Sequence, residues 1–228
     1  NMACTYCVTS LSDHRRTPDE LSADQMLRLV RMLKEHAGIE KVRLTGGEPL
    51  LYPNLIPVIS GIREMGIGNI GMTTNGQLLA KKVKGLVEAG LKKVNLSLDS
   101  LEPEKFKRLG RVGKLHKTLE GIEECMKIGL RVKVNMVVVK GENEDEIVKM
   151  LEFGVRQGVE IRYLELMAMG PLYKKDDFKL VTMHEILERI STRYTVQPVS
   201  AEVDSTSLRY WVPGGYFGII PNNSAPFC

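Results

Sequence analysis

The segment Lys41-Val42-Arg43-Leu44-Thr45-Gly46-Gly47-Glu48-Pro49 decides the fold that the sequence predicts. It joins a short run of strand-forming residues to a glycine-rich, polar turn. The same order recurs where Asn69–Thr74 runs into Asn75-Gly76 and where Lys93–Asp99 ends in polar residues. Paired glycines let a backbone approach a ligand closely, and Glu48 adds a hydrogen-bond acceptor. A plain tight turn explains the same residues without a ligand.

Strand-like and helix-like segments alternate along most of the chain. The predicted strands are Lys41–Thr45, Asn69–Thr74, Lys93–Asp99, Arg131–Lys140 and Val159–Leu166. The stretches between them carry apolar residues at helical spacing. In the first helix, Ser22 and Gln25 stand at capping-box spacing, and Gly38 is the stop signal.

This repetition predicts parallel strands joined by helical crossovers, as in a barrel or in a doubly wound sheet. A doubly wound sheet usually concentrates its site at one switch point, whereas here nearly every strand ends in polar or glycine-rich residues. We therefore predict the α/β class with a partial (β/α)6 TIM-like barrel, whose site lies on the C-terminal rim.

The pattern changes after about Ser191, where Pro, Gly, Ser and aromatic residues surround short strand-like runs at Ser207–Val212 and Tyr216–Ile220. We predict a partial barrel over residues 1–190, and over residues 191–228 an appendage that begins a C-terminal region.

Bulk composition excludes several classes of protein. The 228 residues are 43% hydrophobic and 26% charged, which is ordinary for a globular protein. No apolar run approaches the roughly 20 residues of a membrane span, and the first residues lack the order of a secretory signal. A net charge of +4 is too small and too evenly spread to indicate nucleic-acid binding. We predict a cytoplasmic protein without membrane or nucleic-acid partners.

Cys4 and Cys7 form a Cys-x-x-Cys pair, so both thiols can reach one metal centre from a tight turn. Thiolates suit an iron–sulfur cluster or zinc, and a redox role is a third alternative. Cys125 lies on an apolar helical face, which favours a buried structural thiol. Cys228 alone is either incidental or one ligand of a larger site. The four histidines show no metal-ligand spacing, and we expect them on the surface.

The aromatic Tyr6 before Cys7, with Gly46-Gly47-Glu48-Pro49 about forty residues later, sharpens the choice among these alternatives. The segment resembles the radical S-adenosylmethionine superfamily, whose signature is Cys-x3-Cys-x2-Cys. In that superfamily three cysteines hold a 4Fe–4S cluster whose free iron chelates S-adenosylmethionine, and electron transfer cleaves the sulfonium to a 5′-deoxyadenosyl radical. The first cysteine would stand immediately before Asn1, so the resemblance implies a longer natural chain.

Within the superfamily the chain resembles the GTP 3′,8-cyclases of molybdenum cofactor biosynthesis, the MoaA type, nearly from end to end. Residues 73–76 and 94–99 are shared widely among these enzymes, whereas residues 132–138, 141–146 and 161–167 are typical of the cyclases. Ser224-Ala225-Pro226-Phe227-Cys228 resembles the entry to their second cluster site. Three departures are Val8-Thr9 after Cys7, a short loop before the first helix, and Ala168 after Met167.

The resemblance implies a role for each candidate site residue. Cys4 and Cys7 would bind the first cluster, and Cys228 a second cluster that binds the guanine base. The positions expected to contact S-adenosylmethionine are Tyr6, Gly46, Gly47, Glu48, Ser97 and Met167, and those expected to contact GTP are Arg43, Thr73 and Lys133.

Several of these residues also have a simpler structural interpretation. Met167 would otherwise be barrel core, because methionine often fills gaps. Arg43 and Lys133 are cations within apolar strands, which either point to solvent or face a polar site. Asn95, Asn135, Arg162 and Glu165 are further strand-end candidates.

The activity that the resemblance implies is cyclisation of GTP to (8S)-3′,8-cyclo-7,8-dihydroguanosine 5′-triphosphate, with S-adenosylmethionine and two 4Fe–4S clusters as cofactors. The adenosyl radical removes hydrogen from C3′, and the carbon radical attacks C8 of guanine. Its partners would be GTP, an electron donor such as a flavodoxin or ferredoxin, and a second copy of the chain if the enzyme is a homodimer. Two rival hypotheses are a radical peptide-modifying maturase with auxiliary clusters and a non-catalytic iron–sulfur or nucleotide-binding module.

Overall fold

The computed structural model describes residues 2–7, 20–167, 179–200 and 205–225. They form two compact units. The first unit holds residues 20–96 and 116–132, and the second holds residues 2–7, 97–115 and the described residues from 133 onward. The predicted boundary near residue 190, between a partial barrel and a C-terminal region, stays a prediction; the compact units divide the chain at other positions.

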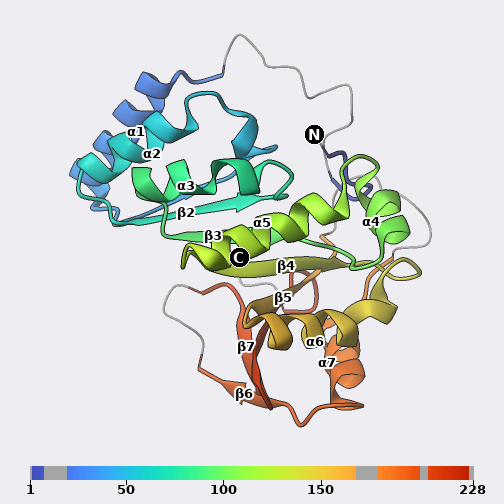
Figure 1. Cartoon of the computed structure of the whole chain (residues 1–228). Coiled ribbons are helices and arrows are strands. Elements are labelled where there is room, and N and C mark those ends of the chain that lie inside the picture. Colours follow the sequence, from blue (N-terminus) through green and yellow to red (C-terminus); the bar gives the residue numbers. More distant parts are fainter. Residues whose placement is uncertain (1, 8–19, 168–178, 201–204, 226–228) are drawn as a thin grey trace. The chain divides into compact units, whose positions relative to one another are not determined.

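The first unit alternates helices with parallel strands (Figure 1). Its elements are α1 (Ala23–Ala37), β1 (Lys41–Leu44), η2 (Pro49–Leu51), α2 (Leu55–Glu64), β2 (Asn69–Thr74), α3 (Leu79–Ala89), β3 (Lys93–Ser97) and α5 (Leu115–Lys127). Val42 of β1 lies beside Ile70 of β2, and Met72 of β2 lies beside Val94 of β3, each in a parallel pairing. The strands therefore end at one edge of the sheet, where their polar loops follow.

Apolar side chains at helical spacing hold α2 against its neighbours α1, α3 and β2. The predicted stripe is confirmed, since α2 buries Leu55, Val58, Ile59 and Ile62. Burying one such aliphatic side chain completely stabilises the fold by about 1.5–3 kcal/mol relative to leaving it exposed.

The first helix, α1, has the predicted capping box at Ser22 and ends at Gly38 in a left-handed conformation. It buries none of its side chains, however, and Leu29 is 46% exposed. Its contact with α2 is a close approach of Leu27 to Gly61, where an added Cβ would stand 2.8 Å from the leucine. The amphipathic pattern thus predicted the helix correctly but not the burial of its apolar face.

The second unit carries the remaining elements. They are α4 (Pro103–Gly110), β4 (Arg131–Val138), η3 (Glu144–Glu146), α6 (Ile147–Gln157), β5 (Glu160–Glu165), α7 (Met183–Ser191), β6 (Gln197–Val199), β7 (Leu208–Val212) and β8 (Gly215–Ile220). Strand β5 pairs in parallel with β4 and with β8, and β7 pairs antiparallel with β8 and β6. The C-terminal strands therefore extend the same sheet as β5.

An aromatic core joins these strands. Phe217 of β8 meets Tyr163 of β5 edge-on, with ring centroids 6.0 Å apart, and stacks on Tyr210 of β7 at 5.2 Å. The buried Tyr163 hydroxyl donates a hydrogen bond to the carbonyl of Ile147 at 2.7 Å, so its polar end is satisfied. In the parts of the chain that the structure describes, no helix is long and apolar enough to cross a membrane.

Candidate active site

The loop that carries Cys4 and Cys7 folds as a tight turn in the second unit. The amide of Cys7 donates to the carbonyl of Cys4 at 3.0 Å, and both cysteine side chains have intermediate exposure. The loop rests on the end of α4, because Ala3 N donates to Gly110 O at 3.1 Å and Thr5 N donates to Leu109 O at 2.9 Å. The last carbonyls of a helix have no partner within it, so this loop satisfies two of them.

Tyr6 connects the cysteine loop to Asp99, which lies in the segment before α4. Its hydroxyl donates to Asp99 Oδ2 at 2.5 Å, and the other carboxylate oxygen of Asp99 accepts from Val137 N of β4 at 2.9 Å. The carbonyl of Asp99 accepts from the side-chain amide of Asn143, which also donates to the carbonyl of Val137. The buried carboxylate of Asp99 thus joins the cysteine loop to β4 within the second unit.

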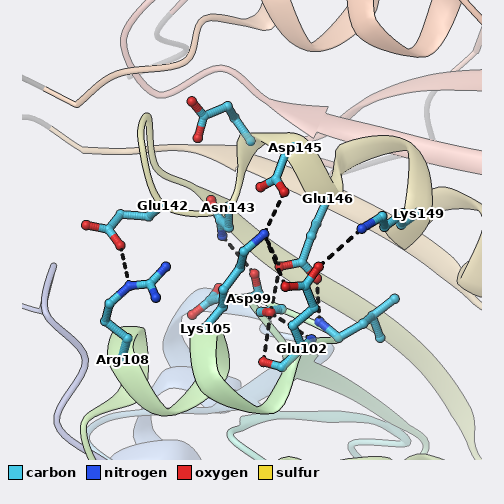
Figure 2. A network of polar contacts seen from close by, with 12 residues as sticks. Asp99, Glu102, Lys105, Arg108, Glu142, Asn143, Asp145, Glu146 and Lys149 are labelled. Carbon is cyan, nitrogen blue, oxygen red and sulfur yellow. Dashed lines mark hydrogen bonds and ion pairs between the residues drawn. The ribbon is translucent and has the colours of Figure 1, made fainter.

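Helix α4 is held in turn by the acidic segment at residues 142–146 (Figure 2). Lys105 lies 2.6 Å from Asp145 and 3.5 Å from the buried Glu146, and Arg108 lies 2.8 Å from Glu142. Glu146 also accepts from the hydroxyl of Ser100 and from the amide of Leu101. The helix that supports the cysteine loop is therefore fixed by charge and by hydrogen bonds.

Burial sets the protonation of the groups around the loop. Burial raises the pKa of the Cys4 thiol to about 11, and the negative charge of Asp99 adds to this effect. Burial also raises the pKa of Asp99 to about 6, against the lowering effect of the hydrogen bond from Tyr6. Cys4 without metal is therefore a thiol at neutral pH, and a metal must displace its proton on binding.

The two thiols suit an iron–sulfur cluster in type and placement, since soft thiolates on a supported turn are its usual ligands. Among the described residues, no group of three metal-binding side chains gathers. The structure thus supplies two ligands on one turn. Cys228 lies outside the described residues, and so does His14.

The glycine-rich loop after β1 belongs to the first unit and is held by Glu48. The Oε1 atom of Glu48 accepts from Leu50 N at 3.0 Å and from the hydroxyl of Thr74 at 2.6 Å, while Oε2 accepts from Asn75 N at 2.8 Å. An ionised carboxylate offers about four lone-pair sites, so three are already used. Glu48 therefore ties its own loop to the end of β2.

The glycines beside Glu48 leave open space for a ligand. Gly46 has a φ of 143°, and an added Cβ on Gly46 or Gly47 would meet no atom within 4 Å. On the neighbouring loop, Thr118 of α5 donates to the carbonyl of Asn75 at 3.0 Å, which fixes the Thr-Asn-Gly turn. Both loops are rigidly held, with an open surface over the first.

Three further candidates lie at or near strand ends. Thr73 is partly buried in β2, Ser97 is the partly buried last residue of β3, and Arg43 is exposed on β1. Met167 follows β5 and is 49% exposed, so it is not a core residue. The structure gives Met167 the accessibility that a ligand contact needs.

Lys133 faces a polar group instead of solvent. Its Nζ lies 2.9 Å from Glu160, which also pairs with Arg162 at 3.1 Å and with Arg209 at 3.3 Å. Lys133 and Arg162 are candidates that the sequence predicts, whereas Glu160 and Arg209 are not among the predicted residues. A signal existed for Glu160, because it stands two residues before Arg162 with the apolar Ile161 between them, so both side chains lie on one face of the strand.

Glu165, another strand-end candidate, binds backbone amides of two other segments. Its carboxylate accepts from the amides of Met183, Asn223 and Ser224 at 2.6, 2.8 and 2.8 Å. It is 1% exposed. Its bonds therefore hold α7 and the segment at residues 223–224 beside the end of β5.

Comparisons with known proteins show to which family the chain belongs. The Radical SAM superfamily pattern matches residues 1–154. The GTP 3′,8-cyclase of Aquifex aeolicus (strain VF5) is 36% identical over 233 residues, which cover 100% of this chain and 72% of that protein. The GTP 3′,8-cyclase of Helicobacter pylori (strain J99) is 37% identical and covers 100% of this chain and 71% of its own length.

Solved structures agree on the fold. SuiB of Streptococcus suis matches with a TM-score of 0.64 at 19% identity, over 84% of this chain and 42% of that one. Methylornithine synthase (PylB) matches with a TM-score of 0.66 at 16% identity, over 84% and 59% of the two chains. These likenesses confirm the predicted α/β class. The chain belongs to the radical SAM superfamily and, within it, to the GTP 3′,8-cyclases.

Proposed function

We propose that this chain cyclises GTP to (8S)-3′,8-cyclo-7,8-dihydroguanosine 5′-triphosphate, the first step of molybdenum cofactor biosynthesis. The observation that carries the proposal is the likeness to GTP 3′,8-cyclases, which covers 100% of this chain and 72% of the Aquifex aeolicus protein, combined with a supported Cys4–Cys7 turn of the kind that an iron–sulfur cluster needs. A rigid turn matters because the protein's contribution to radical chemistry is to orient the reactants and exclude water.

The roles of individual residues follow the same proposal. Cys4 and Cys7 would hold a 4Fe–4S cluster, which when bound supplies the electron that cleaves S-adenosylmethionine; Cys228 would belong to a second cluster. Tyr6, Gly46, Gly47, Glu48, Ser97 and Met167 would bind S-adenosylmethionine. Because three acceptor sites of Glu48 are occupied, its main task is to hold the loop, and one remaining site can accept from the methionyl ammonium.

GTP would bind through Arg43, Thr73 and Lys133. An arginine fork and a lysine point charge suit phosphate oxygens. The reductant would be a small electron-transfer protein such as a flavodoxin or ferredoxin, and the enzyme would work in the cytoplasm, where thiols stay reduced. We also propose a homodimer as its assembly.

The test is anaerobic reconstitution of the full-length protein with iron and sulfide, followed by incubation with S-adenosylmethionine, GTP and dithionite. We expect 5′-deoxyadenosine and a cyclised GTP derivative to form together, as measured by chromatography and mass spectrometry. A Cys4→Ala, Cys7→Ala variant should form neither. Formation of 5′-deoxyadenosine without any GTP-derived product would refute the substrate assignment while leaving the radical chemistry intact.

A further inference from the structure

One face of the sheet in the second unit is polar, whereas the opposite face is the apolar core. In the strand register Lys133 stands beside Glu160, Asn135 beside Arg162, and both Arg162 and Arg209 beside Gly218. Alternate residues of a strand point to opposite faces, so these side chains share one face. Their sequence neighbours Val134, Ile161, Tyr163 and Phe217 are fully buried in the core.

On this polar face, two arginines and a lysine surround one carboxylate. Three cations, Lys133, Arg162 and Arg209, lie within 2.9–3.3 Å of the single carboxylate of Glu160. The side chains of Lys133, Arg162 and Glu160 are 9%, 11% and 11% exposed, and that of Arg209 is 27% exposed. Among the described residues, Arg162 and Arg209 form no ion pair other than that with Glu160, and two partly buried guanidinium groups that share one carboxylate are costly unless an anion completes the arrangement.

The geometry of the two arginines leaves donors available to such an anion. Within the described residues, the ion pairs and hydrogen bonds of Arg162 and Arg209 use the Nε atoms, which leaves the terminal nitrogens of both forks without a protein partner. Arg209 stacks on the ring of Tyr216, 4.1 Å from its centroid, which orients its plane. Gly218 lies between the two arginines, and an added Cβ there would meet the Arg162 side chain at 3.4 Å.

Unsatisfied polar atoms point to the same face. In the described part of the chain, the buried side-chain atoms without a hydrogen-bond partner are Asn135 Oδ1 and Arg209 Nε, whose 3.3 Å contact with Glu160 is an ion pair without hydrogen-bond geometry. Both belong to the polar face. Native proteins rarely bury polar atoms unpaired, and clusters of such atoms indicate a missing partner such as a ligand.

We propose that Arg209, a residue of the C-terminal strand β7, is a further polyphosphate-binding residue. Together with Arg162 and Lys133, it binds the triphosphate of the substrate. Glu160 keeps the three cations in place. The inference rests on the proposed function in one respect, namely that the polyphosphate is that of GTP. Phosphate oxygens would accept hydrogen bonds from the terminal nitrogens of Arg162 and Arg209. The planar guanidinium group favours this geometry.

The test measures binding to the reconstituted full-length protein without S-adenosylmethionine, by calorimetry with inorganic tripolyphosphate, GTP, GMP and guanosine. For Arg209→Met we expect tripolyphosphate and GTP to bind on the order of 10- to 100-fold more weakly, from the loss of charge-assisted bonds. Guanosine should bind unchanged. Arg209→Lys should recover part of the loss because it keeps the charge.

The matched control is Arg193→Met, which removes an arginine of the same unit whose side chain is 67% exposed and paired with Glu152. It should leave all four affinities unchanged, and circular dichroism should show both variants folded. Equal losses for guanosine and GTP, or no loss for tripolyphosphate, would overturn the inference. If the wild type binds tripolyphosphate through Arg209 yet forms no cyclised product from GTP, the proposed function fails while the anion site stands.

Discussion

At the scale of single residues, Asp99 is the point where the cysteine loop meets the sheet. One carboxylate oxygen accepts from Tyr6 of the loop, and the other accepts from Val137 of β4. Each bond is short and partly or wholly buried, so little water can replace either partner. The position of Cys7, the residue after Tyr6, thus depends on a carboxylate more than ninety residues away in sequence.

Tyr6→Phe tests this connection, because it removes one hydroxyl and keeps the ring. Loss of a buried hydrogen bond to a charged acceptor should lower the free energy of unfolding by about 1.5–3 kcal/mol, measured by urea denaturation of the metal-free protein. Hydrogen exchange at the Thr5 amide should also accelerate. Tyr210→Phe is the control, since its hydroxyl makes only a 3.9 Å contact with a methionine sulfur. Unchanged exchange at Thr5 would contradict the role of Tyr6.

Cys125 is predicted to be inert. It is 0% exposed on α5, and burial, with the nearby charge of Glu124 as a lesser cause, raises its pKa to about 12. At pH 8 the thiolate, which is the reactive form, would be roughly one part in ten thousand. Iodoacetamide should therefore modify Cys125 only after unfolding, as mass spectrometry would show. Cys125→Ala should keep the full iron content, and a loss of iron in this variant would be evidence against a purely structural thiol.

At the scale of elements, α4 is the support of the cysteine loop. Its last carbonyls accept from Ala3 and Thr5, while its Lys105 meets three carboxylates, those of Glu102, Asp145 and Glu146. Figure 2 shows Lys105 reaching from the helix toward this acidic segment. The position of the cysteine loop therefore depends, through α4, on the position of the acidic segment.

Lys105→Met should loosen this support. The buried Glu146 would lose its cationic neighbour but keep its bonds from Ser100 and Leu101, so we expect a loss of about 1–3 kcal/mol in unfolding free energy. Iron should dissociate faster from the reconstituted protein, as followed with a chelator that absorbs light when it binds iron. Lys149→Met is the matched control, because Lys149 is 60% exposed and pairs only with Glu102 among the described residues. Equal iron release from both variants would argue against α4 as the support.

The polar face of β4, β5 and β7 depends on one residue, Glu160. Glu160→Ala would leave Lys133, Arg162 and Arg209 close together without their shared carboxylate. Removing one member of a buried ion cluster costs about 3–5 kcal/mol, so urea denaturation should show a large loss of stability. Glu152→Ala, which breaks the exposed pair with Arg193, should cost less than about 1 kcal/mol. Added tripolyphosphate should restore part of the stability of Glu160→Ala, because it supplies the missing negative charge.

At the scale of the whole molecule, periodic patterns in the sequence predicted the strands but not their partners. The five barrel strands begin and end within two residues of their predicted limits, because β-branched runs and glycine stops are local signals. The parallel pairing of β8 with β5 is not local, and neither is the meeting of Arg209 with Glu160, which are far apart in the sequence. Likewise Glu48 was predicted to face a ligand, and only the folded backbone shows how many of its acceptor sites are already used.

The division into two compact units leads to a prediction about metal retention. The cysteine loop, α4 and the C-terminal strands belong to one unit, whose core contains Phe217. Phe217→Ala should cost about 3–5 kcal/mol, and the midpoint of urea-induced iron release should fall with it. Ile62→Ala in the core of the other unit removes a side chain that is also 0% exposed, at a cost of about 2–5 kcal/mol. The Ile62→Ala variant should lower the urea midpoint of iron release less than it lowers the urea midpoint for unfolding of α2, which hydrogen exchange monitors. If the two variants released iron at the same urea concentration, the loop would depend on the stability of the entire chain instead of on its own unit.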